Sequence, residues 1–297
     1  MSETPFVSII IPVFNNLDGL NRALRAIKKQ TYPIDRFETI VIDNGSDISP
    51  RKITEENNAI FLEEHHYLNS PYSARNRGLD VAEGEIIVLL DTTCEPVEVW
   101  LDEGVKAVQS GCDLVGGNVV FDVTDESSLG DMYDSLVNIR MKESVLKRNV
   151  AKTTNLFIHK KVFDSIGWFP EGLRSGGDVR WTGKATRSGF GLCFSESARV
   201  VMKTRGLKQL VSKQYRVAKG MPKIWKEQGG FLYNFIKKGI LFWLPPNPVQ
   251  LIKFIESNNA LFMKKRIIGL FFVGYLLRIV SGAGVWAGIL MLKRSKV

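Results

Sequence analysis

Polar side chains stand at the ends of three apolar runs in the first hundred residues. Residues 12–16 (PVFNN) follow one run, residues 43–46 (DNGS) the second and residues 91–93 (DTT) the third. In an open α/β sheet, a ligand binds beyond the carboxyl ends of the strands, where the strand order reverses. Aspartate opens two of these turns, and carboxylates accept hydrogen bonds from a ligand. The pattern therefore predicts a binding site built from these three turns.

The first turn also excludes one class of chemistry. It holds no Gly-x-Gly-x-x-Gly, so a dinucleotide pyrophosphate has no glycine loop to bind and a hydride-transfer enzyme is disfavoured. Gly282-Ala283-Gly284 is half of such a motif, but it lies in an apolar stretch with no strand before it. We interpret these glycines as packing residues.

Alternating strands and helices are expected to position the turns. Apolar, β-branched runs predict strands at 6–12, 38–42, 85–90, 114–123, 154–160 and 192–202. Helical periodicity is found at 19–30, 50–57, 72–82, 97–110, 178–188 and 208–227, and residues 129–148 form a helix or a long excursion. Near-continuous apolar strands are buried on both faces, which predicts an α/β fold with a parallel, doubly wound sheet.

Charge divides the chain into an acidic and a basic part. Residues 199–297 hold 19 of the 40 Lys and Arg residues but only 2 of the 31 Asp and Glu residues. The same part holds two apolar stretches, 231–246 and 267–292, which suit lipid flanked by lysines and are too apolar for a nucleic-acid groove. We therefore expect a membrane partner, no nucleic acid, and a boundary between the parts within residues 203–230.

The stretch 267–292 is long enough for a membrane helix of about 39 Å. Arg278 interrupts it near the middle, and basic residues flank both ends, so a span, an in-plane helix and a re-entrant arrangement all stay open. Residues 231–244 would add an interfacial helix, and Gly284-x-x-x-Gly288 offers a face to another helix or a second copy of the chain. The alternative is a hairpin packed on a soluble protein.

Two expectations concern the cellular compartment. Residues 1–5 are polar and precede the first strand directly, so no signal peptide is expected and the N-terminal part is predicted to stay in the cytosol. Cys94, Cys112 and Cys193 form no Cys-x-x-Cys pair and are expected to be reduced structural thiols.

Several motifs, in order, resemble those of family 2 glycosyltransferases with the GT-A fold. They lie at 7–16, 30–33, 38–47, 73–85, 89–101, 167–171, 177–178 and 214–216. The resemblance implies a Rossmann-like, doubly wound mixed sheet in a catalytic domain of residues 1–220, followed by membrane-associating helices in 221–297. It implies inverting transfer of a sugar from a nucleotide-sugar, most of all a UDP-sugar, to a lipid-linked or polysaccharide acceptor at the cytoplasmic face of the cell membrane.

The resemblance also implies a donor pocket with a backbone wall, a hydrogen-bond acceptor for uracil or ribose, and cations for the ribose or diphosphate. The residues in these roles are Pro12, Val13 and Phe14 for the wall, Asp43 as the acceptor, and Arg75 and Arg77 as the cations. Each polar residue has a plainer interpretation, Asp43 as the cap of its turn and the arginines as solvated helix charges.

The family's Asp-x-Asp motif, which binds the ribose and a divalent cation, is Asp91-Thr92-Thr93 in this chain. Its second carboxylate is missing, and Lys203 stands where the family commonly has a metal-binding histidine. Asp91 and Glu95 are therefore the candidate ligands of Mg²⁺ or Mn²⁺. The alternatives are metal-independent transfer, in which Lys203 and Arg216 neutralise the leaving diphosphate, or a Lys203 that simply begins the basic tail.

Asp178 resembles the family's catalytic base, which takes the proton of the attacking hydroxyl. The usual Glu-Asp pair is here Gly177-Asp178, and a helix N-cap is the alternative role.

Two rival functions stay open. A degenerate transferase serving as a membrane partner subunit would explain the altered motifs. A sugar-phosphate nucleotidyltransferase would need a Gly-rich loop with Arg and Lys after the first strand, where the chain reads VFNN.

Overall fold

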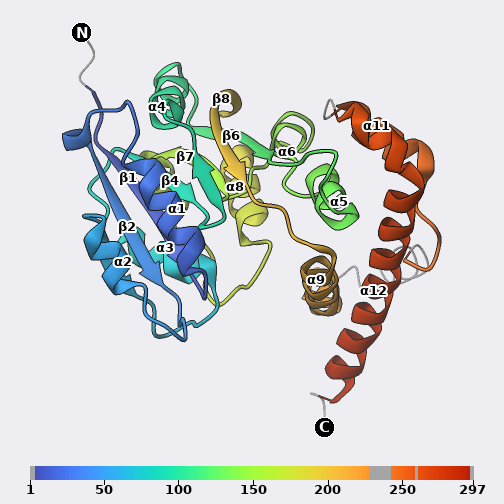
Figure 1. Cartoon of the computed structure of the whole chain (residues 1–297). Helices are drawn as coiled ribbons and strands as arrows, with labels where there is room; N and C mark the ends of the chain where they lie inside the picture. Colours follow the sequence, from blue (N-terminus) through green and yellow to red (C-terminus); the bar gives the residue numbers. More distant parts are fainter. Residues whose placement is uncertain (1–3, 228–241, 258–259, 295–297) are drawn as a thin grey trace. The chain divides into compact units, whose positions relative to one another are not determined.

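A computed structural model describes residues 4–227, 242–257 and 260–294 (Figure 1). Contacts between residues divide the chain into two compact units, residues 1–121 with 139–203 and residues 122–138 with 204–297. The predicted division into residues 1–220 and 221–297 concerns function and stays a prediction. Residues 231–241 of the predicted interfacial helix 231–244 lie outside the described residues.

A mixed sheet of eight strands forms the centre of the first unit, in the order β3-β2-β1-β4-β7-β6-β8-β5. The strands are β1 (Val7–Val13), β2 (Phe37–Asp43), β3 (Ile60–Glu63), β4 (Ile86–Leu90), β5 (Cys94–Pro96), β6 (Leu114–Phe121), β7 (Asn155–His159) and β8 (Leu192–Met202). β1 to β4 pair in parallel, as predicted, and β6 is parallel to β8. β7 is antiparallel to β4 and β6, and β5 is antiparallel to β8, so the whole sheet is mixed.

Helices cover both faces of this sheet. In the first unit they are α1 (Leu17–Ile27), α2 (Arg51–Glu56), α3 (Pro71–Leu79), α4 (Trp100–Gln109), α6 (Met141–Arg148), α7 (Lys161–Ile166) and α8 (Gly177–Arg187). Ile9, Ile10 and Ile11 of β1 are all fully buried. Because successive side chains of a strand point to opposite faces, both faces of β1 are covered. Because both faces are buried, the strand sequence is a continuous apolar run rather than an alternation of polar and apolar residues.

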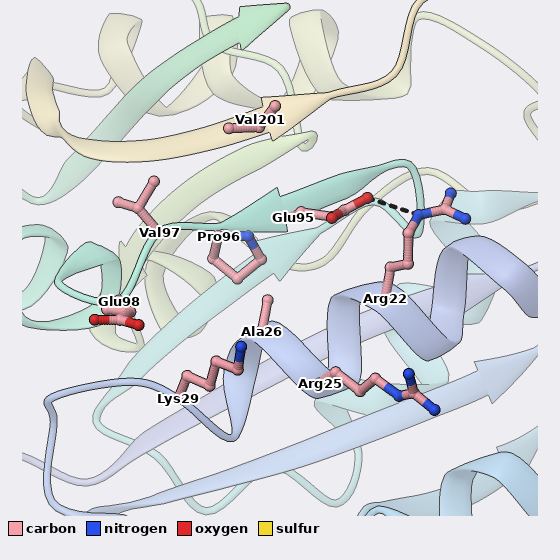
Figure 2. Close-up of a pocket in the computed structure, with 9 residues that line it drawn as sticks. All are labelled: Arg22, Arg25, Ala26, Lys29, Glu95, Pro96, Val97, Glu98 and Val201. Atoms are coloured by element: carbon pink, nitrogen blue, oxygen red, sulfur yellow. Dashed lines mark hydrogen bonds and ion pairs between the residues drawn. The ribbon is translucent and has the colours of Figure 1, made fainter. Parts of the chain in front are cut away.

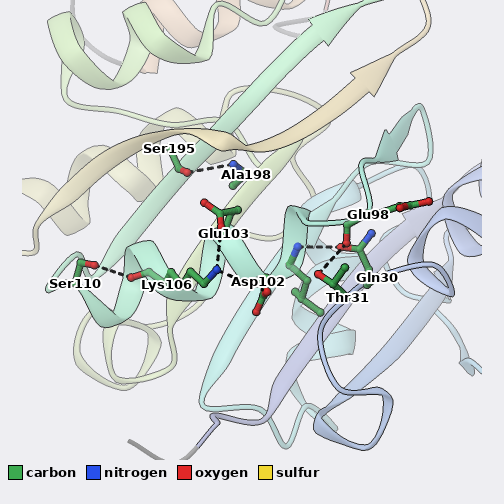
Figure 3. Close-up of polar contacts among 10 residues, drawn as sticks. Gln30, Thr31, Glu98, Asp102, Glu103, Lys106, Ser110, Ser195 and Ala198 are labelled. Carbon is green, nitrogen blue, oxygen red and sulfur yellow. Dashed lines mark hydrogen bonds and ion pairs between the residues drawn. The ribbon is translucent and has the colours of Figure 1, made fainter. Parts of the chain in front are cut away.

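The start of α4 is fixed to the turn after α1. The N–H of Thr31 donates to the carbonyl of Glu98 at 2.9 Å, and the Gln30 amide oxygen accepts the N–H of Leu101 at the same distance (Figure 3). Farther along α4, Lys106 pairs with Glu103 at 3.0 Å on the exposed face (Figure 3). The first two bonds fix the start of α4, and with it the end of the segment that follows Asp91, against the turn after α1.

The expectation of reduced cysteines is wrong for two of the three. Cys112 and Cys193 form a disulfide, whereas Cys94 is a buried thiol outside any disulfide, as expected. The reason is the sheet order: β6 and β8 are neighbours, and Val115 pairs with Cys193. The two thiols therefore meet across this pair, although 81 residues separate them along the chain.

The second unit is helical in its described part. It holds α5 (Leu129–Val137), α9 (Leu207–Glu227), α11 (Pro248–Ser257), a short 3₁₀ helix (Leu261–Arg266) and α12 (Ile267–Arg294). The predicted helix 129–148 is interrupted at Ile139, where φ is +41°, and becomes α5 and α6. Within the described residues, residues 261–292 are the one helical stretch that is long and apolar enough to cross a membrane by length and composition.

Candidate active site

The turns after β1 and β2 are hydrogen-bonded to each other. Asn15, in the left-handed region with φ of +49°, donates its N–H to Ser46 Oγ at 2.9 Å and its side-chain amide to Asp47 at 3.0 Å. The N–H of Asp47 donates back to Asn15 Oδ1 at 2.8 Å. The two strand ends predicted to share a site are therefore fixed side by side.

Asp43 lies at the end of β2, opposite Val13 of β1. Its Oδ1 accepts the N–H of Ser46 at 3.1 Å, so Asp43 does cap its turn, as the plainer interpretation had it. Oδ2 has no hydrogen bond to any residue that the structure describes and remains available to a ligand. Beyond the buried Val13, Phe14 leaves the sheet with 45 % of its surface exposed, while Pro12 is half-buried.

Arg75 and Asp91 form an ion pair at the carboxyl end of β4. The Arg75 NH2 group lies 2.6 Å from Asp91 Oδ1, and Asp91 Oδ2 accepts the hydroxyl of Thr154 at 3.0 Å. Arg75 is only 2 % exposed, which excludes its interpretation as a solvated helix charge. Gly78 lets α3 approach the sheet, because a β-carbon there would come within 2.8 Å of Ile10.

Arg77 lies on the other side of α3. Two residues along a helix correspond to a rotation of about 200°, so Arg77 points away from the face that carries Arg75. It is exposed and pairs with Asp80 at 3.3 Å. The structure therefore does not bring Arg77 together with Asp91.

Asp178 lies in the first turn of α8, whose N-cap is Gly176, so Asp178 is not the N-cap. Its Oδ1 accepts the hydroxyl of Tyr72 at 3.1 Å and the N–H of Val179 at 2.8 Å, and Oδ2 has no hydrogen bond to the described residues. Burial, and then the charge of Asp178, raise the pKa of Tyr72, which therefore stays a proton donor at neutral pH. One carboxylate oxygen is thus held and the other is available.

Tyr72 connects the Arg75–Asp91 ion pair to Asp178. The guanidinium carbon of Arg75 lies 5.8 Å from the centre of the Tyr72 ring, and the Tyr72 hydroxyl reaches Asp178. Gly177 makes this arrangement possible, because a β-carbon at this position would lie 2.8 Å from the ring. The absence of a side chain at Gly177 therefore provides the space for the tyrosine.

Lys152 is a charged neighbour of Asp178. The hydroxyl of Thr182 bonds to both the N–H and the carbonyl of Ala151, at 3.1 and 3.2 Å, and to the carbonyl of Asp178 at 2.8 Å. These bonds fix the chain at Lys152 against the first turns of α8. Burial lowers the pKa of the Lys152 ammonium, and the negative charge of Asp178 acts against this shift.

The candidate metal ligands are already paired with cations. Glu95 lies 2.6 Å from the Nε of Arg22, at the edge of a cavity of about 530 Å³ between α1 and β5 (Figure 2). Asp91 is held by Arg75, and the Thr93 hydroxyl is buried without a partner in the described residues. No cluster of three or more His, Cys, Asp or Glu side chains suited to a metal occurs among those residues. Mg²⁺ and Mn²⁺ prefer carboxylates and other oxygen ligands, and the two candidate carboxylates are each engaged by an arginine.

Lys203 follows β8 directly. Met202 pairs with Cys94 in the antiparallel β5–β8 ladder, so the next position in this register sets Lys203 across from Thr93. The two positions for which the family resemblance implied metal ligands therefore stand opposite each other in this register. Lys203 is exposed and makes no hydrogen bond or ion pair with the part of the chain that the structure describes. Arg216 belongs to the second unit, where its side chain is exposed on α9.

Sequence reasoning missed three of these residues, Tyr72, Lys152 and Thr154. Tyr72 precedes Arg75 by three positions, a spacing that puts both on one face of a helix and was available as a signal. Lys152 and Thr154 lie before β7, and only the pairing of β7 with β4 brings this segment to Asp91. No local pattern marks them.

The comparisons with known proteins agree with this fold. Residues 8–165 match the model of the family "Glycosyl transferase family 2". "Glycosyltransferase AglE" of Haloferax volcanii is 36 % identical over 293 residues, which are 95 % of this chain and 96 % of that protein. An undecaprenyl-phosphate 4-deoxy-4-formamido-L-arabinose transferase of Proteus mirabilis is 31 % identical over 118 residues, 37 % of this chain and 36 % of that one.

Two solved structures are similar in fold. The mannosyltransferase PcManGT of Pyrobaculum calidifontis, in complex with GDP-Man and Mn²⁺, gives a TM-score of 0.58 over 96 % of this chain and 88 % of its own. TarS of S. aureus in complex with UDP gives 0.55 over 98 % and 92 %, and both are 18 % identical to this chain. These likenesses show the fold, a GT-A fold as the resemblance implied. With the family model and the relative of nearly full length, they establish that the chain belongs to glycosyl transferase family 2 and is a glycosyltransferase.

Proposed function

We propose that this glycosyltransferase transfers a sugar, with inversion, from a UDP-sugar to a lipid-linked glycan acceptor at a membrane surface. One observation carries the proposal: Asp91, Arg75, Tyr72 and Asp178 form a continuous series of contacts from the strand-end turns to the start of α8. A donor bound at the turns and an acceptor beside α8 would meet along this series.

The donor is assigned to the strand-end turns. Oδ2 of Asp43 would accept a hydrogen bond from the uracil or the ribose, beside the wall formed by Pro12, Val13 and Phe14. Asp91, whose side chain is 34 % exposed, would bind the ribose side, with Arg75 fixing its orientation. The UDP complex of TarS supports uracil as the base, whereas the neighbour PcManGT binds GDP-Man.

Asp178 is assigned as the base. The acceptor hydroxyl attacks the anomeric carbon while its proton passes to Oδ2 of Asp178. The bond from that carbon to the diphosphate breaks on the opposite side, and UDP leaves with the electron pair. Tyr72, by donating to Oδ1, would keep the reacting oxygen turned toward the acceptor.

We assign the neutralisation of the negative charge on the leaving diphosphate to cationic side chains of this chain. Lys203, across from Thr93 in the β5–β8 register, is the first candidate, and the family resemblance adds Arg216 as the second. The Mn²⁺ in the PcManGT complex belongs to that protein, and in this chain Asp91 and Glu95 are each paired with an arginine. We therefore propose transfer that does not depend on a metal.

The acceptor class rests on relatives and on the C-terminal helices. The relative from P. mirabilis is named for an undecaprenyl-phosphate substrate, and residues 261–292 are apolar enough to contact lipid. The cytoplasmic face stays a prediction from the sequence. The Cys112–Cys193 disulfide argues against it, because disulfides are rare in reducing compartments.

The test is a screen of UDP-sugars and GDP-mannose by thermal shift, followed by transfer to a lipid-linked saccharide. We expect UDP-sugars to raise the melting temperature and one of them to be transferred, with and without Mn²⁺. A donor that binds but is neither hydrolysed nor transferred would favour the non-catalytic partner subunit, which the missing second carboxylate suggests. Preference for GDP-mannose would overturn the assignment of uracil.

A further inference from the structure

One long face of α12 is apolar and exposed. It carries Ile268, Phe272, Leu276, Trp286 and Leu290, and Ile268 and Phe272 are 72 % and 63 % exposed. Ala283 fills the interval and is also exposed. A helix on the surface of a soluble protein normally has polar residues on its outer face. Here the outer face, about 33 Å from residue 268 to residue 290, has none.

The opposite face of α12 packs on α9. Gln214 donates to Ser281 Oγ at 2.8 Å, and a β-carbon at Gly284 would come within 2.7 Å of the carbonyl of Tyr215. A β-carbon at Gly288 would come closer still to the carbonyl of Lys219. The predicted Gly-x-x-x-Gly face is therefore used inside the unit, where α9 packs against α12 between Val273 and Gly288.

α9 has a hydrophilic outer face. Exposed residues on it include Lys208, Ser212, Arg216 and Lys226, and the partly buried Lys213 donates to Asn138 Oδ1 at 2.8 Å. α5, which also contacts α12, carries the buried Asp134, whose Oδ2 accepts the N–H of Arg205 at 3.0 Å. Charged groups therefore lie on α9 and α5, two helices that contact α12.

These contacts decide between the arrangements that the sequence leaves open. If α12 crossed a bilayer with its contacts intact, the segment of α9 from Leu210 to Lys219 would enter the hydrocarbon core beside it. Lys213, Arg216 and Lys219 would then lie at membrane depth, where cationic side chains are strongly disfavoured. A helix that lies along the surface leaves α9 in the headgroup region and water.

Arg278, which interrupts the apolar stretch, fits the same arrangement. Its NH1 group donates to the carbonyls of Leu244 and Pro245, both at 3.1 Å. The guanidinium is thus bonded to backbone outside the helix and does not need a polar partner in lipid. At the start of α12, Lys264, Lys265 and Arg266 are exposed, which complements an anionic surface.

We propose that α12 lies in the plane of an anionic phospholipid surface, with the face from Ile268 to Leu290 inserted at the acyl boundary, and does not cross the bilayer. The inference deepens the membrane location in the proposed function by specifying the binding face, the lipid charge and the depth. It does not depend on the identity of the donor or on catalysis.

Vesicle flotation of the full chain tests the binding face. We expect binding to phosphatidylcholine vesicles that contain phosphatidylglycerol, and weaker binding without it. Phe272→Ser with Leu290→Ser should lower binding by about tenfold or more and leave the melting temperature unchanged, because both side chains are exposed. The matched control, Ile34→Ser with Leu146→Ser, replaces exposed apolar residues of the first unit and should bind like the wild type. Equal loss in both pairs would overturn the assignment.

Labelling in sealed vesicles tests the depth. Cysteines are introduced by Lys265→Cys and, in a second protein, after Val297, and an impermeant maleimide is added outside. An in-plane helix exposes both ends to the same side, so both proteins should be labelled as fully as in detergent. A span exposes one end only, and this result would overturn the proposal. The wild type is the blank, because Cys94, its thiol outside the disulfide, is buried.

The alternative to lipid is that a second copy of the chain covers the exposed apolar face of α12. Light scattering without lipid tests it, with expected masses of a monomer for the wild type and for Phe272→Ser with Leu290→Ser. A dimer that this pair of substitutions dissociates would assign the face to a second copy and overturn the lipid assignment. Flotation and labelling need no donor. An inactive protein that still binds vesicles would therefore count against the proposed function alone.

Discussion

The guanidinium of Arg75 lies 2.6 Å from the carboxylate of Asp91, in a position that is 2 % exposed at the arginine and 34 % exposed at the aspartate. The pair is therefore closed on the protein side and open on the ligand side. Thr154 holds the second oxygen of Asp91, so the carboxylate has one orientation before any donor arrives. If Asp91 binds the donor as proposed, Arg75 is a positioning residue, and its removal should affect donor binding through Asp91.

Arg75→Met should destabilise the fold and weaken the donor. It leaves Asp91 without its cation, at a cost of about 1–3 kcal/mol for an unpaired, partly buried group. We expect a lower denaturant midpoint and weaker UDP binding by calorimetry. Arg77→Met is the matched control on the same helix, and because its pair with Asp80 is exposed, it should change stability by no more than about 0.5 kcal/mol. Equal effects of the two substitutions would contradict the special role of Arg75.

Asp178→Asn should lower turnover by roughly 10²–10⁴ and leave donor affinity nearly unchanged. Asparagine keeps the oxygen that accepts from Tyr72 and Val179, so the helix start should survive, but it cannot take a proton. Steady-state kinetics with varied donor measures the effect. Asp164→Asn, an exposed first-turn aspartate of α7, is the control. An Asp178→Asn enzyme with wild-type turnover would leave Asp178 a purely structural residue.

Transfer should survive EDTA, because the ligands expected for a metal are bound to Arg75 and Arg22. Lys203→Ala should lower turnover by roughly 10²–10³, the usual effect of removing one charge-stabilising donor. Lys203→Arg should recover part of the rate, since it keeps the charge. Lys147→Ala, an exposed lysine of α6, is the control. If EDTA abolishes transfer and Mn²⁺ restores it, the Lys203 assignment is wrong and Glu95→Gln becomes the decisive variant.

Lys152→Met should stabilise the protein at neutral pH. Burial lowers the pKa of Lys152 below the ordinary 10.5, against the attraction of Asp178, and Arg148 and Arg140 lower it further. Between the folded pKa and 10.5, the unfolded chain binds more protons than the folded one, so this group makes stability rise with pH. The gain from Lys152→Met should therefore be largest at neutral pH and shrink near about pH 10. Denaturant midpoints of the variant, the wild type and Lys147→Met at both pH values measure it. A gain that is independent of pH would contradict the shift.

The strand-end turns could be predicted from sequence because they depend on local pattern. Apolar runs followed by Asp43 or Asp91 define the carboxyl ends of buried strands, and a parallel arrangement brings such ends together. β3 and β5 were not predicted, since runs of four and three residues are too short to show a period. The pairing of Cys112 with Cys193 follows from the order of β6 and β8, which no local pattern contains.

The mixed part of the sheet was implied only by the family resemblance. Leu156 and Phe157 of β7 are as apolar as the residues of β4, so the sequence does not show that the two strands run antiparallel. The arrangement nevertheless decides which side chains surround Asp91, because it brings Thr154 to the carboxylate. Side chains that meet through strand order, such as Thr154 and Asp91, therefore required the structure.

Gly177→Ala should lower both stability and turnover, because it inserts a methyl group at a position 2.8 Å from the Tyr72 ring. Overpacking of this kind costs about 1–3 kcal/mol, and moving the ring also withdraws its hydroxyl from Asp178. Gly183→Ala, in the same helix, is the matched control: its nearest neighbour, 3.2 Å away, is the flexible end of Arg187, so alanine should be tolerated. Tyr72→Leu provides the second step of a double-mutant cycle. Because a smaller side chain removes the clash, Gly177→Ala should cost less in the Tyr72→Leu background than in the wild type. Denaturant unfolding of the four proteins measures the coupling, and strictly additive free energies would show that the glycine is not there to accommodate the tyrosine.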